Sequence, residues 1–292
     1  MTGNLYGMVT VSSSSEYTQL ALNSFFRHTK LTAQDRFVLI DNDGAWCQQP
    51  DQIVTRDQIH LNSLPGNFSQ NINQLINMAD QGDQDLMFLN NDVVFTPKWN
   101  QRMILGNSVL SVPACNQTHD RGFPQSLSIQ EFGARYGKLN VAAHVHAVQV
   151  REPWESLLMP TYVCRIPRQI YRAVGLFDTA FNVGGEDVDY RLRLLIQGFT
   201  IKYCSGYLLH FNGRSSWNGV ETIDQTQTRN QQYTSHFIRK WGEDLFNLCV
   251  TGGQPQLVIG KYQLQDLVVQ GRFNQIILEV LKYNDVTRTN LL

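Results

Sequence analysis

The stretch LMFLNNDVVFTPKW, residues 86–99, places three polar residues directly between two apolar runs. Its first four residues are typical of a buried strand, and Asn90, Asn91 and Asp92 follow at the carboxyl end of that strand. In open α/β sheets, the carboxyl ends of the strands line the crevice that binds ligands. A carboxylate beside amide oxygens suits a hard cation such as Mg²⁺ or Mn²⁺. Because Asn-Asn-Asp is also common in turns, the stretch alone is open to both interpretations.

Strands and helices alternate through the first ninety residues. Apolar runs predict strands at residues 8–11, 36–40, 58–61 and 86–89. Helical periodicity predicts two helices, over about residues 16–25 and 68–79, and Ser13 with Glu16 is expected to form a capping box that opens the first. The second strand again ends in polar residues, Asp41 and Asn42. This alternation predicts an α/β fold with parallel strands, right-handed crossovers and a nucleotide-type crevice.

The composition is that of an ordinary folded protein. Its 292 residues suffice for one large domain with an appendage, and a formal charge of -1 argues against a strongly basic nucleic-acid binder. No apolar run approaches the ~20 residues of a membrane span, and the N-terminus lacks a secretory signal pattern. We therefore expect a cytoplasmic protein, and a peripheral association with a membrane stays open. The five cysteines form no C-x-x-C pair, so neither a disulfide framework nor a zinc ribbon is indicated.

The second half of the chain is less regular. Strands are expected at residues 109–113, 141–150, 162–166, 201–204 and 207–209, and helices near residues 99–108, 167–175, 186–198 and 233–241. Residues 116–139 look like a long loop of the kind that binds ligands. His144 and His146 would share one strand face, but a polar face explains them better than a metal site because no third ligand is nearby. We expect one domain over residues 1–245 and a small helical extension over residues 246–292.

The sequence GGEDVDYRLRLLIQG, residues 184–198, predicts a helix that begins directly after two glycines. Two i,i+4 ion pairs are expected in it, Asp187 with Arg191 and Asp189 with Arg193. Acidic residues favour helix N-termini in any case, and this explains Asp189. It does not explain the two glycines, which a ligand or another backbone passing close to the chain would explain. The lone His210, at the end of a predicted strand, is by default a structural residue.

Taken together, these motifs resemble the large inverting glycosyltransferase family that includes rhamnosyltransferase-like proteins and chitin and cellulose synthases. The resemblance covers about residues 5–242, and it implies a GT-A type nucleotide-binding (Rossmann-like) mixed sheet flanked by helices. Beyond the motifs above, Phe68 with Asn73 matches the start of a family helix. The closing Lys-Trp-Gly of the family corresponds to Lys240, Trp241 and Gly242. The main departure is Asn90, where many members have Asp, a stronger ligand for a hard metal.

The resemblance also implies a set of site residues. Contacts to a nucleotide-sugar are expected from Thr10, Val11, Ser12, Asp41, Asn42, Asn73, Asn90, Asn91, Asp92, Gly185 and Glu186. Asp92 and His210 would hold a divalent cation, Mn²⁺ or Mg²⁺, and Asp187 would be the general base. The implied reaction is metal-dependent transfer of a hexosyl or deoxyhexosyl group, with inversion. The donor would be a nucleotide-diphosphate-sugar and the acceptor a hydroxyl of a glycan or another molecule.

Three other functions are compatible with parts of this pattern. A degenerate member could bind nucleotide-sugar without transfer. A nucleotidyltransferase shares the architecture but usually needs a Gly-rich phosphate loop, whereas VTVSSSSE, residues 9–16, is Ser-rich. A carbohydrate-binding scaffold could stack sugars on exposed aromatic residues such as Trp46, Trp154 and Trp217.

Overall fold

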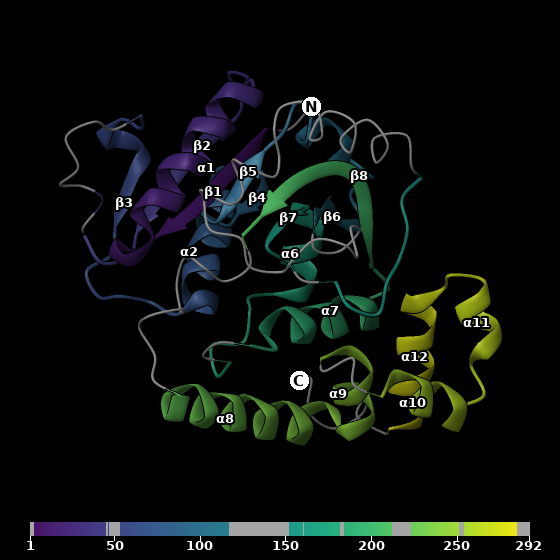
Figure 1. The fold of residues 1–292 in the computed structure, drawn as a ribbon. Coiled ribbons are helices and arrows are strands. Elements are labelled where there is room, and N and C mark those ends of the chain that lie inside the picture. The colour runs from purple at the N-terminus through teal and green to yellow at the C-terminus, as the bar shows by residue number, and fades with distance from the viewer. Residues whose placement is uncertain are drawn as a thin grey trace.

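The computed structural model describes residues 3–44, 46, 53–116, 152–159, 161–181, 184–211, 223–250 and 254–284. An eight-stranded sheet lies at its centre, with helices on both faces (Figure 1). The strands are β1 (Asn4–Thr10), β2 (Arg36–Asp41), β3 (Ile59–Leu61), β4 (Asp85–Leu89), β5 (Val93–Phe95), β6 (Val109–Cys115), β7 (Val163–Ile166) and β8 (Thr200–His210). The helices of the first 200 residues are α1 (Ser15–His28), α2 (Phe68–Gln81), α6 (Arg168–Val174) and α7 (Glu186–Ile196).

The sheet is mixed, with the strand order β3-β2-β1-β4-β7-β6-β8-β5. The first four strands of this order are parallel to one another, as the alternation of strands and helices predicts. β7 then runs antiparallel to both of its neighbours, and β5 runs antiparallel to β8 at the far edge. The α/β class and the mixed sheet are confirmed, and the purely parallel arrangement holds only for one half.

Two helices of the N-terminal half cover opposite faces of the sheet. Successive residues of a strand point to opposite faces. Tyr6 of β1 packs edge-to-face on Phe25 of α1, with ring centroids 5.4 Å apart. The next residue, Gly7, faces α2 so closely that a Cβ there would lie 2.5 Å from Leu75 Cδ2. The absence of a side chain at Gly7 therefore lets α2 lie directly on the sheet.

Three local predictions need correction. Ser13 and Glu16 do not form the expected capping box, because a short 3-10 helix, η1 (Ser12–Ser14), precedes α1 and makes Ser14 its N-cap. The helix expected near residues 99–108 is only a 3-10 turn, η4 (Asn100–Met103). The two strands expected at residues 201–204 and 207–209 are one curved strand, β8, with a register shift opposite Pro113 and Ala114. The curvature brings Gly206 so near Trp99 that a Cβ would lie 2.4 Å from its carbonyl oxygen.

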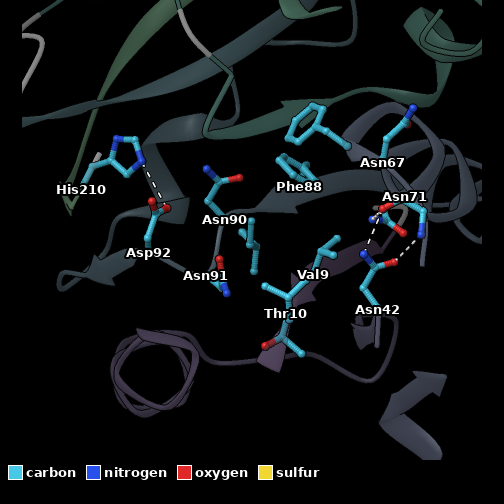
Figure 2. A pocket seen from close by; sticks show the side chains of 14 residues that line it. Val9, Thr10, Asn42, Asn67, Asn71, Phe88, Asn90, Asn91, Asp92 and His210 are labelled. Atoms are coloured by element: carbon cyan, nitrogen blue, oxygen red, sulfur yellow. Dashed lines mark hydrogen bonds and ion pairs between the residues drawn. The ribbon is translucent and has the colours of Figure 1, made fainter. Parts of the chain in front are cut away.

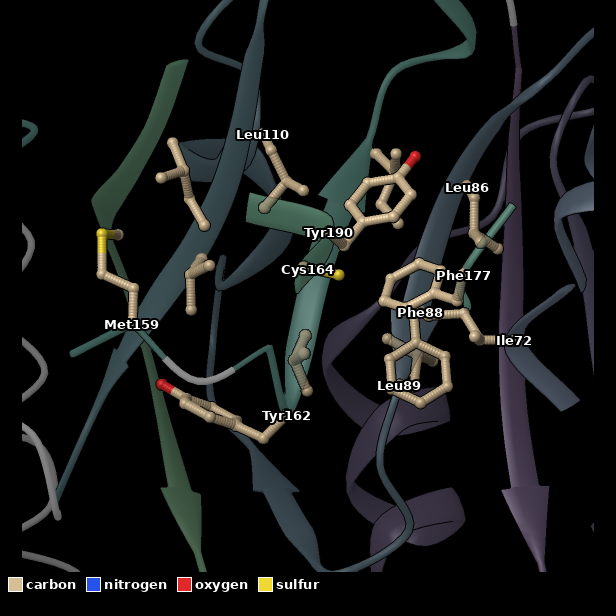
Figure 3. Close-up of a cluster of buried hydrophobic side chains, with 14 of the residues drawn as sticks. Ile72, Leu86, Phe88, Leu89, Leu110, Met159, Tyr162, Cys164, Phe177 and Tyr190 are labelled. Atoms are coloured by element: carbon tan, nitrogen blue, oxygen red, sulfur yellow. The ribbon is translucent and has the colours of Figure 1, made fainter. Parts of the chain in front are cut away.

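The apolar core follows the central strands. Side chains of β4 and β7 pack against α2 and α7 in one cluster (Figure 3). Within it, the rings of Phe177 and Tyr190 stack in parallel at 4.1 Å. The four described cysteines, Cys115, Cys164, Cys204 and Cys249, are buried, and no disulfide joins them.

The C-terminal part is helical and lies beyond α7 when viewed from the sheet (Figure 1). Its helices are α8 (Ile223–Trp241), α9 (Glu243–Cys249), α10 (Pro255–Lys261), α11 (Gln265–Val269) and α12 (Phe273–Tyr283). Apolar residues of α9, α10 and α12 belong to the same core cluster as the sheet, and α12 packs directly on α7. Among the described helices, none is both long and apolar enough to cross a lipid bilayer.

Candidate active site

The register of two antiparallel strands brings Asp92 and His210 together. Val93, the first residue of β5, pairs with His210, the last residue of β8. Asp92 precedes Val93, and its carbonyl oxygen accepts a hydrogen bond from the Phe211 amide at 2.9 Å. The pairing therefore sets residues 118 positions apart in the sequence side by side, at the end of the sheet where β1 and β4 also end.

The Asp92 and His210 side chains form a close, buried pair (Figure 2). Asp92 Oδ1 lies 3.2 Å from His210 Nε2, and both residues are less than a tenth exposed. The His210 backbone is held by Asn116, which accepts from its amide at 2.7 Å and donates to its carbonyl, and the ring of Tyr162 stacks on the imidazole at 4.6 Å. Burial lowers the pKa of His210, but the Asp92 carboxylate outweighs that effect and raises the pKa to about 10.

A pocket of about 250 Å³ lies beside this pair (Figure 2). Seven of the predicted site residues line it, namely Thr10, Val11, Asn42, Asn90, Asn91, Asp92 and His210. The remaining lining residues are Val9, Gly66, Asn67, Phe68, Asn71, Phe88 and Leu89. Apolar side chains and neutral amides thus dominate the wall, and the described lining contains one carboxylate, one imidazole and no lysine or arginine.

One wall of the pocket is held by a network of asparagine amides. Asn42 Oδ1 accepts from Asn62 Nδ2 and from the Gly66 amide, both at 2.8 Å, and Asn42 Nδ2 donates to the Gly66 carbonyl at 2.9 Å. Asn71 completes the network, because its Oδ1 accepts from Asn62 and its Nδ2 donates to Gly66. Three of the hydrogen-bonding positions of Asn42 are occupied, so its side chain mainly holds the loop that precedes α2.

Two predicted residues on the opposite wall are tied to α1. Thr10 Oγ1 lies 2.7 Å from Thr18 Oγ1, and Asn91 Nδ2 donates to Ser14 Oγ at 2.7 Å and to Thr18 Oγ1 at 2.9 Å. Both donor hydrogens of the Asn91 amide are therefore used. Its oxygen is turned away from α1, toward the side where Asn90 and Asp92 lie (Figure 2).

The predicted nucleotide contacts Asp41 and Asn73 lie outside the pocket lining. Asp41 is fully buried, and its Oδ1 accepts from the Gly44 amide at 3.1 Å in the turn that follows β2. Asn73 exchanges two hydrogen bonds with the Phe177 backbone, at 2.7 and 2.9 Å. Ser12 is the first residue of η1. The roles expected for these residues stay predictions.

The two glycines before α7 both have left-handed backbones, with φ of 103° at Gly184 and 83° at Gly185. The space around them is tight as well, because a Cβ on Gly184 would lie 3.1 Å from the Tyr233 ring, and one on Gly185 would lie 3.3 Å from the Phe181 ring. Packing by aromatic side chains, together with positive φ, therefore accounts for this glycine pair. The turn also lets Gly184 donate its amide to Glu186 Oε2 at 2.6 Å.

Glu186 and Asp187 follow as neighbouring carboxylates at the start of α7. Burial, and then the charge of Asp187, raises the pKa of Glu186 to about 7. Burial also raises the pKa of Asp187, although the backbone amides of Val188 and Thr161 donate to that carboxylate and oppose the rise. Both groups thus hold protons more tightly than ordinary carboxyls, which suits a group that must accept a proton near neutral pH.

Asp187 is connected to the pocket through two adjacent residues. The Thr161 amide donates to the Asp187 carboxylate, and the next residue, Tyr162, stacks on His210 and accepts the Asn90 amide at its carbonyl, at 2.9 Å. Asp187 and the other residues of its turn, Gly185 and Glu186, do not themselves line the 250 Å³ pocket. The start of α7 therefore adjoins the Asp92–His210 end of the site through the backbone of residues 161–162.

Sequence reasoning missed part of the pocket wall. Gly66, Asn67 and Asn71 line it, and none of them was expected to. A usable signal was present, because Asn67 and Gln70 form a capping box at the start of α2, with bonds of 2.9 and 2.8 Å. Because this helix starts next to the predicted strand-end crevice, the capping box could have identified these residues as part of the pocket wall.

Some expectations concern other parts of the chain. Trp46 is 3% exposed, so the expectation of an exposed ring at this position is wrong. Trp154 is half-buried and stacks on Tyr203 at 5.4 Å. His144, His146, Trp217, the loop at residues 117–139 and the strand at 141–150 lie outside the described residues.

The donor atoms of the site suit a divalent cation. Within the described ranges, no group of three His, Cys, Asp or Glu side chains is placed to hold a metal ion. Mn²⁺ and Mg²⁺ nevertheless often take one or two protein ligands and complete their shell with water and phosphate oxygens. Two ligands at ~2.1 Å and at a right angle would lie about 3 Å apart, close to the 3.2 Å between Asp92 Oδ1 and His210 Nε2. Once a cation displaces the proton that Asp92 stabilises on His210, the pair fits two neighbouring positions of such a shell.

The mixed α/β sheet with its flanking helices is a GT-A type fold. The crystal structure of GalNAc-T7 with UDP, GalNAc and Mn²⁺ superposes with a TM-score of 0.51 at 13% identity, over 84% of this chain and 50% of that one. This chain thus spans about half the length of that protein. The mannosyltransferase PcManGT from Pyrobaculum calidifontis, in complex with GDP-Man and Mn²⁺, has a TM-score of 0.47 at 11% identity, over 96% of this chain and 86% of that one.

No family model matches the sequence, and a search of curated proteins finds no relative. At 13% identity, the likeness to GalNAc-T7 establishes the fold alone.

Proposed function

We propose that the protein transfers a sugar from a nucleotide-diphosphate-sugar to an acceptor hydroxyl, with inversion, and that it depends on Mn²⁺ or Mg²⁺. The observation that carries this proposal is the buried Asp92–His210 pair beside an amide-lined pocket. Among the described lining residues there is no lysine or arginine, and a bound divalent cation would balance the negative charge of the donor diphosphate. GalNAc-T7, which has a similar fold, was crystallised with UDP, GalNAc and Mn²⁺.

In this proposal, each part of the site has one task. A bound divalent cation would stabilise the negative charge that develops on the leaving nucleoside diphosphate. Asp92 and His210 would hold it, and Asn91 would present its amide oxygen to the same region. Phe68, Phe88 and Val9 would exclude water from the nucleoside. Asp187 would accept the proton of the acceptor hydroxyl as that oxygen attacks the anomeric carbon from the side opposite the leaving group.

The test is turnover of a donor panel. The full chain is incubated with Mn²⁺, with UDP-, GDP- and dTDP-linked sugars and with a mixture of acceptor glycans, and both nucleoside diphosphate release and product mass are followed. We expect release and transfer with at least one donor, an inverted anomeric configuration by NMR, and loss of both activities in EDTA. Tight donor binding without release would instead favour the degenerate binding protein, and release without inversion would contradict the assigned mechanism.

The substitution Glu186→Gln is expected to stabilise the fold at pH 8 by at most about 3 kcal/mol and to change its stability little at pH 4. Because the pKa of Glu186 is raised from 4.5 to about 7, the folded protein keeps a proton that the unfolded chain releases. The contribution of this bound proton to the free energy of unfolding is fully present below about pH 4.5, and it is lost as the pH rises through about 7. A neutral glutamine avoids that loss.

Urea unfolding at pH 4 and pH 8 measures the effect on the free energy of unfolding. Glu243→Gln, at an exposed position on α9, is the matched control and should not show the stabilisation at pH 8. An equal change at pH 4 and pH 8 in the Glu186 variant would contradict the raised pKa.

A further inference from the structure

Arg191 lies one helical turn after Asp187 and is 2% exposed. Its Nη1 donates to the Leu157 carbonyl at 2.6 Å, and its Nη2 donates to the Ser156 carbonyl at 2.8 Å and to Asn274 Oδ1 at 2.9 Å. The guanidinium is thus bonded to residues 152–159 and to α12, and not, as the i,i+4 spacing predicts, to Asp187. Three separate parts of the chain meet at this side chain.

Asn274, the second residue of α12, completes the junction. Asn274 is 4% exposed. Its backbone N–H donates to Glu155 Oε2 at 2.9 Å, and its side-chain Nδ2 donates to the Ile201 carbonyl in β8 at 2.8 Å. Together with the bond from Arg191, these contacts connect α12 with α7, with β8 and with residues 152–159. An asparagine side chain supplies one acceptor and one donor here in a single small group.

A buried cation in this position needs a reason beyond stability. Removing a guanidinium from water costs several kcal/mol, and apolar replacements of buried charges are often neutral or stabilising. The three oxygens that accept these hydrogen bonds from Arg191 are all neutral. The carboxylates that act on its charge are those of Glu155 and Asp187. The charge of Arg191 therefore lies close enough to Asp187, the candidate base, to act on it electrostatically.

We propose that Arg191, held by Asn274 and by residues 152–159, is a positioning residue that fixes the first turn of α7 and keeps a positive charge beside Asp187. The C-terminal helix α12 then belongs to the catalytic apparatus. This inference rests on the proposed function, because the position and charge of Asp187 matter to the reaction only if Asp187 is the base.

The charged and titratable groups around this junction set its pH dependence. Those that act on Asp187 or Arg191 are Glu186 on α7, Glu155 in the connecting segment, Tyr203 on β8, Cys164 on β7 and Cys249 on α9. The positive charge of Arg191 lowers the pKa of Asp187 against the effect of burial. Since a general base acts only when deprotonated, loss of that charge moves the acid limb of the rate profile to higher pH.

The experiment compares Arg191→Met with Arg191→Lys in the full chain, using the donor that turns over in the panel. In Arg191→Met we expect the acid limb of kcat/KM to shift upward by about one pH unit, so that the loss is about tenfold at low pH and small at high pH. Arg191→Lys keeps the charge and should restore most of the profile. A loss in Arg191→Met that is uniform across pH would overturn the assigned role of the charge.

A second measurement needs no activity. Asn274→Leu should speed amide hydrogen exchange in the first turn of α7 several-fold and, in the active enzyme, lower kcat with an unchanged donor KM. Tyr262→Phe is the control, because Tyr262 bonds to Asp244 and Asn284 within the same helical part. Exchange in Asn274→Leu equal to that in the control would overturn the proposal. If the wild-type chain transfers no sugar, the proposed function fails, and the exchange data still decide whether Asn274 holds α7.

Discussion

Replacing Asp187 with Asn is expected to lower kcat for sugar transfer by about 10²–10⁴-fold, the usual contribution of a general base. The amide has nearly the same shape and can still accept the hydrogen bond that Val188 donates to Oδ1 at 2.8 Å. It cannot accept the proton of the acceptor hydroxyl. Donor affinity should therefore stay within about twofold of wild type, since the base acts only on the attacking oxygen.

The same substitution should not destabilise the fold. Burial raises the pKa of Asp187, which means that the folded state disfavours its charge. An uncharged amide removes that penalty, so we expect a Tm at pH 8 equal to or above that of wild type. An inactive but stable variant would separate catalysis from folding.

Asp178→Asn is the matched control for this experiment. Asp178 Oδ2 bonds to Lys240 Nζ at 2.7 Å, away from the pocket lining. Burial opposes the effect, but Lys240 and the other donors lower the pKa of Asp178 to about 2, so its charge stabilises the folded state. This variant should lose Tm and keep kcat. An Asp187→Asn variant that transfers sugar at near the wild-type rate would remove Asp187 from the mechanism.

Replacing Asp92 with Asn is expected to lower transfer by more than about 100-fold, because the cation contributes several kcal/mol of charge stabilisation. An amide oxygen is a weaker ligand for a hard cation than a carboxylate. The variant should therefore lose the part of nucleoside diphosphate affinity that depends on Mn²⁺ and keep the part that does not.

Calorimetric titration of the nucleoside diphosphate released in the donor panel, with Mn²⁺ and with EDTA, measures both parts. Asp80→Asn is the control, because Asp80 is a half-exposed carboxylate of α2 that pairs with Arg172. It should show the wild-type response to Mn²⁺. Wild-type affinity that is the same in Mn²⁺ and in EDTA would contradict the metal site.

Much of the fold can be predicted from sequence because its signals are local. The apolar run of β4 and the polar residues after it identify a strand end, and the parallel pairing of β1, β2 and β4 follows from the alternation of strands with helices. The capping box at Ser13 failed because η1 tightens the chain before α1, and the backbone of one turn is set by contacts that periodicity does not encode. The register shift in β8 also depends on contacts that periodicity does not encode, so the strand was predicted as two.

The site divides in a similar way. Asp92 and His210 could be named from a resemblance to a known family. Their contact across 118 positions depends on the antiparallel pairing of β5 with β8. The contacts of Asn62 and Asn71 depend on the path of a loop. The partners of Arg191 come from residues 156–157 and 274, so helical spacing alone suggested the wrong partner.

The hydrogen-bond network of Asn42, Asn62, Asn71 and Gly66 has a consequence for how the pocket depends on salt and pH. Hydrogen bonds among amides involve no net charge, so neither ionic strength nor acidity across the ordinary range weakens them appreciably. Attraction between a diphosphate and a cation, in contrast, is screened by salt. Rising salt would thus reduce occupancy of the pocket while its shape stays the same, and the empty protein would remain ready to bind again on dilution.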